Sequence, residues 1–313
     1  MAKILGIDHV GVGVKNMSVM KEFYQGLLEF TEIFGEMPEG DHEPIHALMR
    51  TCPTIHSAIQ MNQKSGGIFV DLFCHTYPKP RPIRKDFRYG DIGVSKVTIT
   101  VCDLNQFYKE FQVRLNFCSQ IHHVKIPGWG DYAFVYARDP EGNLIEFIDG
   151  ERFSIKQRFG GVRWIGISVT DLERSLDFYK RYLGFDKTII NINESFSGNV
   201  DEISKSEQTK LRSCVLGMSH GNGMVELFES IKPRGRSIPF CTNWGDIGYL
   251  QLCLLGDNIY DIEKYFQSED LEFMLKPQIM SSDDPQNTGL SFLYIRDPDG
   301  IPVEVMVLPQ KKS

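Results

Sequence analysis

The feature that most constrains the fold is a repeat that runs along the whole chain. Short segments recur 155 residues later: 23–24 at 178–179, 70–73 at 225–228, and Gly-Asp-Ile-Gly at 90–93 again at 245–248. Near the ends of the two halves, Arg-Asp-Pro-Glu-Gly at 138–142 matches Arg-Asp-Pro-Asp-Gly at 296–300 after three additional residues. Chance similarity between short segments would not keep one offset over this length, so we interpret the chain as a duplication.

Each half contains two similar modules. Residues 7–14 alternate as in a strand with one buried face, and apolar residues at helical spacing follow a cap at Asn16 or Ser18. The pattern returns at 94–101, 162–169 and 249–254, each time with room afterwards for about three strands. The last strands are predicted at Phe69–Cys74, Leu144–Ile148, Met224–Phe228 and Pro302–Val307. We therefore predict an α+β fold of four βαβββ modules, two in residues 1–150 and two in residues 151–313.

Composition narrows the class of protein. The chain is 42% hydrophobic and 24% charged, with a net charge of −7 and no basic stripe, so we expect no nucleic-acid partner. The first residues run into a strand pattern without a signal peptide, and no apolar run is long enough to span a bilayer, so we expect no membrane partner. The seven cysteines stand singly and form no Cys-x-x-Cys pair, which favours reduced thiols and a cytoplasmic location.

Three motifs together resemble a known family. A strand opens on Asp-His-Val at 8–10, a helix ends in Phe-Tyr followed by Leu-Gly-Phe at 183–185, and the Arg-Asp-Pro-Asp/Glu-Gly turn leads into a strand with a glutamate. This pattern resembles the vicinal oxygen chelate superfamily of glyoxalases, bleomycin-resistance proteins and ring-cleaving dioxygenases. The resemblance implies half-open barrels of two modules each, with metal ligands on the first and last strand of every module. It does not fix the reaction, because this fold also carries epimerases, lyases, transferases and metal-free binders.

Strand alternation identifies the residues that point into the barrels. Aliphatic residues of one parity fill the first strand of each module and should face the helices. The inward positions of the first strands are then His9, Lys96, Trp164 and Gln251, and those of the last strands are Asp71, Glu146, Glu226 and Glu304. Four carboxylates between aliphatic residues are costly to bury unless they are paired or bound to a metal.

The pairing of modules decides which site exists. If neighbouring modules pair, each barrel contains one poor ligand, Lys96 or Trp164. If the first module pairs with the fourth and the second with the third, one barrel has a complete set of His9, Asp71, Gln251 and Glu304. The other barrel is then plugged by Trp164, and Lys96 neutralises Glu146 or Glu226. We favour this second pairing, which is similar to that of the chlorohydroquinone-cleaving dioxygenases of the superfamily.

One imidazole, one amide and two carboxylates suit Mn²⁺, Zn²⁺, Ni²⁺, Co²⁺ or Mg²⁺. Iron is less suited, because Gln251 stands where an iron-dependent ring-cleaving relative has a second histidine. The leading hypothesis is a metal-dependent isomerase, epimerase or lyase, in which the ion polarises a carbonyl or stabilises an enediolate. The alternatives are an extradiol-type dioxygenase and a metal-free binding or resistance protein. A buried histidine satisfied by Asp71 would give the same sequence pattern as a metal ligand.

The proton carrier and the partners are less constrained by the sequence. His56, in the predicted strand pair of the first module, is our candidate catalytic base, with His46 and Tyr294 as alternatives. We expect a small-molecule substrate, and exposed sheet edges make a homodimer an open alternative to a monomer.

Overall fold

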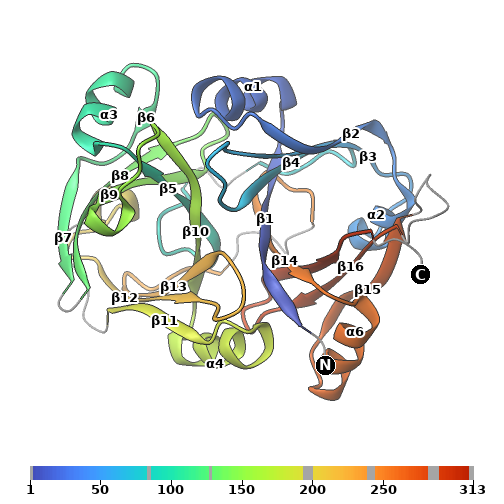
Figure 1. Cartoon of the computed structure of the whole chain (residues 1–313). Helices are drawn as coiled ribbons and strands as arrows, with labels where there is room; N and C mark the ends of the chain where they lie inside the picture. Colours follow the sequence, from blue (N-terminus) through green and yellow to red (C-terminus); the bar gives the residue numbers. More distant parts are fainter. Residues whose placement is uncertain are drawn as a thin grey trace.

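The computed structural model describes residues 3–82, 86–126, 129–192, 200–237, 244–280 and 289–309. It contains two curved mixed sheets that lie side by side, with helices packed against them at the top and bottom of the view in Figure 1. The predicted α+β fold of four βαβββ modules is confirmed. Short additional helices stand between the second and third strands of modules 1 and 3.

The elements of each half follow the same order. Modules 1 and 2 contain β1 (Ile4–Val14), α1 (Met17–Lys21), the π-helical η1 (Glu22–Leu27), β2 (Glu32–Asp41), α2 (Glu43–Met49), β3 (Ile55–Asn62), β4 (Phe69–Tyr77), β5 (Gly93–Val101), α3 (Leu104–Phe111), β6 (Asn116–Phe117), β7 (His122–Ile126), β8 (Gly130–Arg138), β9 (Leu144–Gly150) and the short η2 (Glu151–Phe153). Modules 3 and 4 contain β10 (Phe159–Val169), α4 (Leu172–Leu183), β11 (Lys187–Ile192), α5 (Asp201–Ser204), β12 (Lys210–Gly217), β13 (Met224–Lys232), β14 (Gly248–Gly256), α6 (Ile259–Ser268), β15 (Phe273–Met280), β16 (Leu290–Arg296) and β17 (Pro302–Val307).

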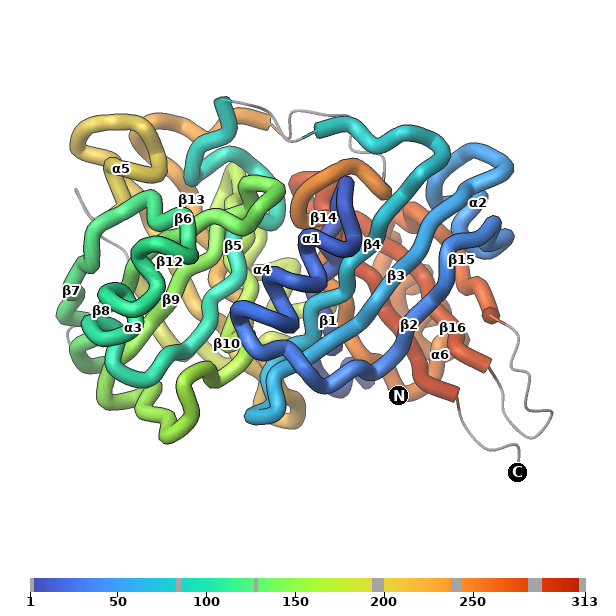
Figure 2. Tube along the Cα trace, turned by 90° about the horizontal axis from the view of Figure 1, so that it is seen from above, coloured from blue at the N-terminus to red at the C-terminus, as the bar shows by residue number. Residues whose placement is uncertain are grey.

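Each sheet combines a module from the first half with one from the second. The eight-stranded sheet runs β15-β16-β17-β14-β1-β4-β3-β2 and therefore contains modules 1 and 4. The nine-stranded sheet runs β11-β12-β13-β10-β5-β9-β8-β6, with β7 paired to β8, and contains modules 2 and 3. In Figure 2 the strands from both ends of the chain lie together on one side of the molecule. We call the first sheet the cavity half-barrel, because its strands line a cavity at His9, and the second the filled half-barrel, because Lys96 and Trp164 occupy the equivalent position there.

The repeated Gly-Asp-Ile-Gly motif joins the two halves. Asp91 of the first copy is buried and accepts hydrogen bonds from Nε and Nη2 of Arg236, at 2.8 and 2.6 Å. Asp246 of the second copy accepts two bonds from Nε of Arg81, at 3.1 and 3.0 Å. Each aspartate thus binds an arginine from the connecting segment of the other half, and bidentate pairs of this kind fix geometry as well as adding energy.

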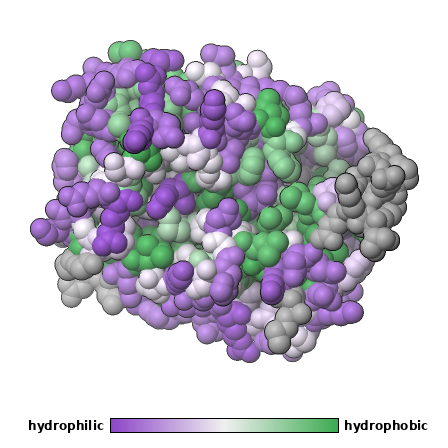
Figure 3. Space-filling model, viewed as in Figure 1, coloured by the Kyte–Doolittle hydropathy of each residue, from purple (hydrophilic) through white to green (hydrophobic). Residues whose placement is uncertain are grey.

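The hydrophobic core lies between the sheets and the helices, as alternation predicts. Val10 and Val12 of β1 and Ile165 and Ile167 of β10 are completely buried, and they belong to one continuous cluster. On the face shown in Figure 3, hydrophilic residues predominate and hydrophobic residues lie between them. Among the described residues, no helix has the length and apolar character that crossing a membrane requires.

Candidate metal centre and its cavity

A bulge in β1 places two polar side chains at the start of the site. Ile7 pairs with Leu254 and Val10 with Leu252, so Asp8 and His9 together stand opposite the single residue Cys253. Both are buried, and Nδ1 of His9 lies 2.8 Å from Oδ2 of Asp8. Strict alternation would turn Asp8 toward the helices. Sequence analysis therefore missed Asp8, because a bulge leaves no mark on the alternation pattern.

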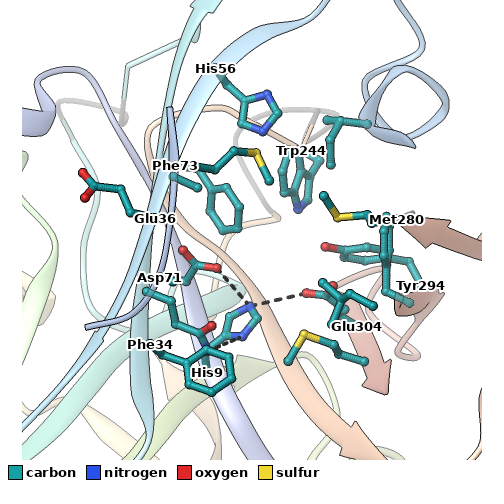
Figure 4. Close-up of a pocket in the computed structure, with 18 residues that line it drawn as sticks. His9, Phe34, Glu36, His56, Asp71, Phe73, Trp244, Met280, Tyr294 and Glu304 are labelled. Carbon is teal, nitrogen blue, oxygen red and sulfur yellow. Dashed lines mark hydrogen bonds and ion pairs between the residues drawn. The ribbon is translucent and has the colours of Figure 1, made fainter. Parts of the chain in front are cut away.

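The structure brings together the four residues that alternation selected. Nε2 of His9 lies 3.4 Å from Oε2 of Glu304 and 3.8 Å from Oδ2 of Asp71. Nε2 of Gln251 lies 3.3 Å from the same imidazole nitrogen and donates a 2.5 Å hydrogen bond to Glu304. Figure 4 shows His9 between the two carboxylates at one end of a cavity. The four residues come from β1, β4, β14 and β17, the central strands of the cavity half-barrel.

Burial makes this cluster electrostatically unusual. Burial raises the pKa of Asp71 to about 7, and its Oδ1 atom has no hydrogen-bond partner in the described part of the chain. Burial by itself would lower the pKa of His9, but Cys253, Asp8 and Glu304 outweigh it and raise that pKa well above its usual value. A cation held between the two carboxylates would be strongly stabilised here, because little water screens the charges.

The orientation of Gln251 differs from that expected of a metal ligand. Its Oε1 atom accepts a hydrogen bond from the indole Nε1 of Trp244, so its amide nitrogen faces His9 and Glu304. The two ends of an amide are assigned from such hydrogen bonds. A half-turn of the amide would present the oxygen to the cluster and would break the bond with Trp244. The sequence offered one signal for Trp244, since it lies at the repeat position of Tyr89, beside the cluster of the filled half-barrel.

A second grouping shares the imidazole. Asp8, His9 and Cys253 are buried and carry potential ligand atoms within 4.8 Å of one another. We favour Asp71 and Glu304 as partners of His9 for two reasons. The Nδ1 side of His9 is already bonded to Asp8, and burial raises the pKa of Cys253 well above its usual value, which keeps the thiol protonated and a poor ligand.

The cavity above the cluster has a volume of about 260 Å³. His9, Asp71 and Glu304 line one end, and the walls are mostly aromatic and methionine side chains. This size and lining suit a small organic molecule.

The candidate proton carriers lie at three different places. Tyr294 lines the cavity and pairs with Glu304 in the register of β16 and β17. His56 also lines the cavity, but its ring contacts are with His42, His75 and Trp244, none of which belongs to the cluster, so its role as a base stays a prediction.

His46 lies outside the cavity lining. On α2, its Nε2 atom lies 2.6 Å from Oδ1 of the half-exposed Asp41. This position gives no support to His46 as the base.

The equivalent cluster of the filled half-barrel is a closed ion-pair network. Nζ of Lys96 lies 2.7 Å from Oε2 of Glu146 and 2.8 Å from Oε2 of Glu226, which confirms the predicted neutralisation. The hydroxyl of Tyr136 donates to Glu146 at 2.7 Å. Trp164 is buried in an aromatic cluster, as the prediction of a plug required. Among the described residues, these side chains therefore occupy the position in this half-barrel that corresponds to the cluster at His9.

Comparisons with known proteins agree with this architecture. The sequence model of the Glyoxalase/Bleomycin resistance protein/Dioxygenase superfamily matches residues 6–147 and 161–305. The chain belongs to this superfamily. Among solved structures, glyoxalase I from Zea mays aligns with a TM-score of 0.61 and 14% identity, covering 96% of this chain and 92% of the maize protein. A candidate dioxygenase from Bacillus subtilis aligns with a TM-score of 0.57 and 13% identity, covering 99% of this chain and 87% of that protein.

At such identities these superfamily members establish a shared fold and not a shared reaction. No curated protein sequence matches the chain at a significant level. The choice of reaction within the superfamily therefore depends on the residues of the site.

Proposed function

We propose that this chain is a metal-dependent enzyme of the superfamily, which binds a small oxygenated substrate in the cavity half-barrel. His9, Asp71 and Glu304 would hold one divalent ion, and Gln251 would join them once its amide turns. The ion is one of Mn²⁺, Zn²⁺, Ni²⁺, Co²⁺ or Mg²⁺, for which this oxygen-rich set with a single imidazole is suited. The reaction class that we infer is isomerisation, epimerisation or elimination.

The observation that carries the proposal is the arrangement around Nε2 of His9. When a metal ion displaces the Nε2 proton and the remaining ring proton at Nδ1 faces Asp8, the Nε2 lone pair would point to the place where both carboxylates and the amide converge. Asp71 adds a buried oxygen without a hydrogen-bond partner among the described residues. A buried acceptor in that state is expected to have a ligand. These features fit a metal ion better than a histidine satisfied by Asp71 alone.

The backbone of β1 makes room for this cluster. A side chain at Gly11 would place its Cβ 2.9 Å from Cγ of Gln251, closer than real Cβ contacts allow. Glycine is therefore required for β1 and Gln251 to approach each other at the floor of the cavity.

The metal ion and the residues around the cavity would have different roles in the reaction. When bound, the ion would polarise vicinal oxygens of the substrate and lower the cost of developing negative charge. Asp8 would hold His9 in the tautomer that a ligand needs. The buried hydroxyl of Tyr294, whose pKa burial and Glu304 raise well above its usual value, would keep its proton and donate a hydrogen bond to Glu304 at the edge of the cavity. The apolar walls would exclude water from the reacting groups.

Elemental analysis of purified protein, paired with oxygen uptake, separates this proposal from its alternatives. We expect close to one equivalent of Mn, Zn, Ni or Co per chain, or of added Mg²⁺, and no oxygen consumption with catechol. Stoichiometric iron with oxygen uptake would instead establish an extradiol-type dioxygenase. Full retention of small-molecule binding after chelation, with no metal bound on reconstitution, would establish a metal-free binding protein.

A further inference from the structure

The cavity has a second polar end, which the metal cluster does not use. His56 on β3 lines the cavity at the end away from His9 (Figure 4). Its ring stacks on that of His75 on β4, with centroids 4.9 Å apart and planes inclined by 16°. The indole of Trp244 meets both rings edge-on, at centroid distances of 6.4 and 5.3 Å. We call His56 and His75 the imidazole pair.

Within the part of the chain that the structure describes, neither ring of the imidazole pair has a hydrogen-bond partner. His56 is 0% exposed and His75 is 3% exposed, and both nitrogens of each ring are unpaired among the described residues. A neutral imidazole carries one N–H donor and one acceptor, so the pair buries two donors without an acceptor. Buried N–H groups in that state are rare in native proteins, and His56 lines the cavity, so a bound ligand is the expected acceptor for the N–H group of His56.

Both rings are neutral at neutral pH. Burial and the neighbouring histidines His75 and His42 lower the pKa of His56 to about 3, against a smaller opposite effect of Asp41. Burial lowers the pKa of His75 to about 4, although Asp246 acts in the opposite direction. The pair is therefore a hydrogen-bond donor and not a cation at the pH of a cell.

The duplication supplies an internal comparison. His56 faces His75 in the register of β3 and β4, and the equivalent pair in β12 and β13 is Leu211 with Ser230. Leu211 packs in the aromatic cluster of the filled half-barrel, and Ser230 Oγ donates to the carbonyl oxygen of Pro233 at 2.5 Å. The filled half-barrel thus forms the same strand pair without histidines at these two positions. Their presence in the half-barrel with a cavity points to a ligand.

We propose that His56 donates a hydrogen bond to a carbonyl or carboxylate oxygen of the substrate, and that His75 holds the His56 ring in place by stacking. Between this end and the cluster at His9 lie Phe73 and Trp244, and the rest of the cavity lining is mostly apolar (Figure 4). The substrate class is therefore a small molecule with an apolar middle, vicinal oxygens at one end and an oxygen acceptor at the other. The inference of vicinal oxygens depends on the proposed metal function, whereas the inference of an oxygen acceptor at the His56 end does not.

The test uses metal-stripped full-length protein, so that its outcome does not depend on the metal site. Benzamide, benzoate and toluene share one ring and differ in the acceptor, and their binding is measured by calorimetry together with ¹⁵N spectra of the imidazoles. We expect benzamide or benzoate to bind the wild type at least about tenfold more tightly than toluene, the scale of one buried hydrogen bond. Binding of benzamide as well as benzoate identifies a carbonyl subsite, and binding of benzoate alone identifies a carboxylate subsite.

Variants separate a binding role from a structural one. In His56→Phe, the ratio of the affinity for benzamide or benzoate to that for toluene should fall to about one. His56→Gln, which keeps an N–H donor, should restore part of this preference. His75→Phe should weaken the preference less than His56→Phe. Leu211→Met, at the equivalent position of the filled half-barrel, should leave it unchanged. Equal binding of all three probes by the wild type, or a preference that survives His56→Phe, would overturn the proposal.

Discussion

Nε2 of His9 on β1 lies 3.4 Å from Oε2 of Glu304 on β17, so side chains from the first and last strands of the chain meet at the floor of one cavity. This contact exists because β14 pairs with β1 on one side and with β17 on the other. The pairing of module 1 with module 4 thus gathers the polar residues of two distant segments. The same pairing leaves Lys96 and Trp164 together in the other half-barrel.

Asp8 should control metal affinity without being a ligand. Asp8→Ala removes the acceptor of the His9 Nδ1 proton and should weaken Zn²⁺ binding by about 10- to 100-fold, the usual effect of losing such a partner. Asp8→Asn keeps an acceptor oxygen and should lose less. The measurement is competition with a chromophoric chelator.

The matched control for this prediction is Ser213→Ala, which removes a hydrogen bond to Glu226 in the filled half-barrel and should leave affinity unchanged. If Asp8→Ala bound Zn²⁺ as tightly as the wild type, Asp8 would have no part in holding the imidazole.

Lys96 should be a stability residue with no influence on the metal. Lys96→Met leaves Glu146 and Glu226 buried without their counter-charge, which should lower the free energy of unfolding by about 3–5 kcal/mol. Chemical denaturation followed by circular dichroism measures the loss. Adding Glu146→Gln and Glu226→Gln to Lys96→Met should recover much of it, because no uncompensated charge then remains. A Lys96→Met protein as stable as the wild type would show that the ion pairs of Lys96 with Glu146 and Glu226 do not stabilise the folded state.

The imidazole pair should make the protein sensitive to acid. The folded-state pKa of His56, about 3, lies below the unfolded value of 6.5, so the unfolded chain binds the proton more readily. The stability tied to neutral His56 is therefore fully present above pH 6.5 and is lost as the pH falls toward 3. His56→Phe removes this loss and should gain about 2–3 kcal/mol relative to the wild type between pH 7 and pH 4.5. Urea denaturation at the two pH values measures the difference.

Asp71 acts in the opposite sense, because its folded-state pKa, about 7, lies above the ordinary aspartate value of 3.8. Its ionisation costs stability as the pH rises from about 4 to 7 in the metal-free protein. The comparison of His56→Phe with wild type cancels this contribution. A pH-independent difference between the two proteins would show that His56 is not buried in its neutral form.

Much of this site could be predicted from the sequence, because period-two alternation is a local property of each strand. His9, Asp71, Gln251 and Glu304 converge as the alternation and the favoured pairing of modules implied. Other features required coordinates. The bulge that turns Asp8 inward is invisible to alternation.

The orientation of Gln251 was equally hidden, since it depends on Trp244, which reaches the site from outside any predicted strand. Sequence analysis also missed His75. Its importance comes from stacking on a residue of the neighbouring strand, and one sequence does not show which residues face each other across a sheet.

Titration of metal-free protein with Zn²⁺ or Mn²⁺, for the wild type and His9→Ala, tests the central claim most directly. Glu146→Gln, which changes the equivalent carboxylate of the filled half-barrel, serves as the matched control. We predict close to one ion per chain for the wild type and for Glu146→Gln, and less than about a tenth of that for His9→Ala, because the only imidazole of the proposed set is gone. A His9→Ala protein that binds a full equivalent as tightly as the wild type would contradict the account.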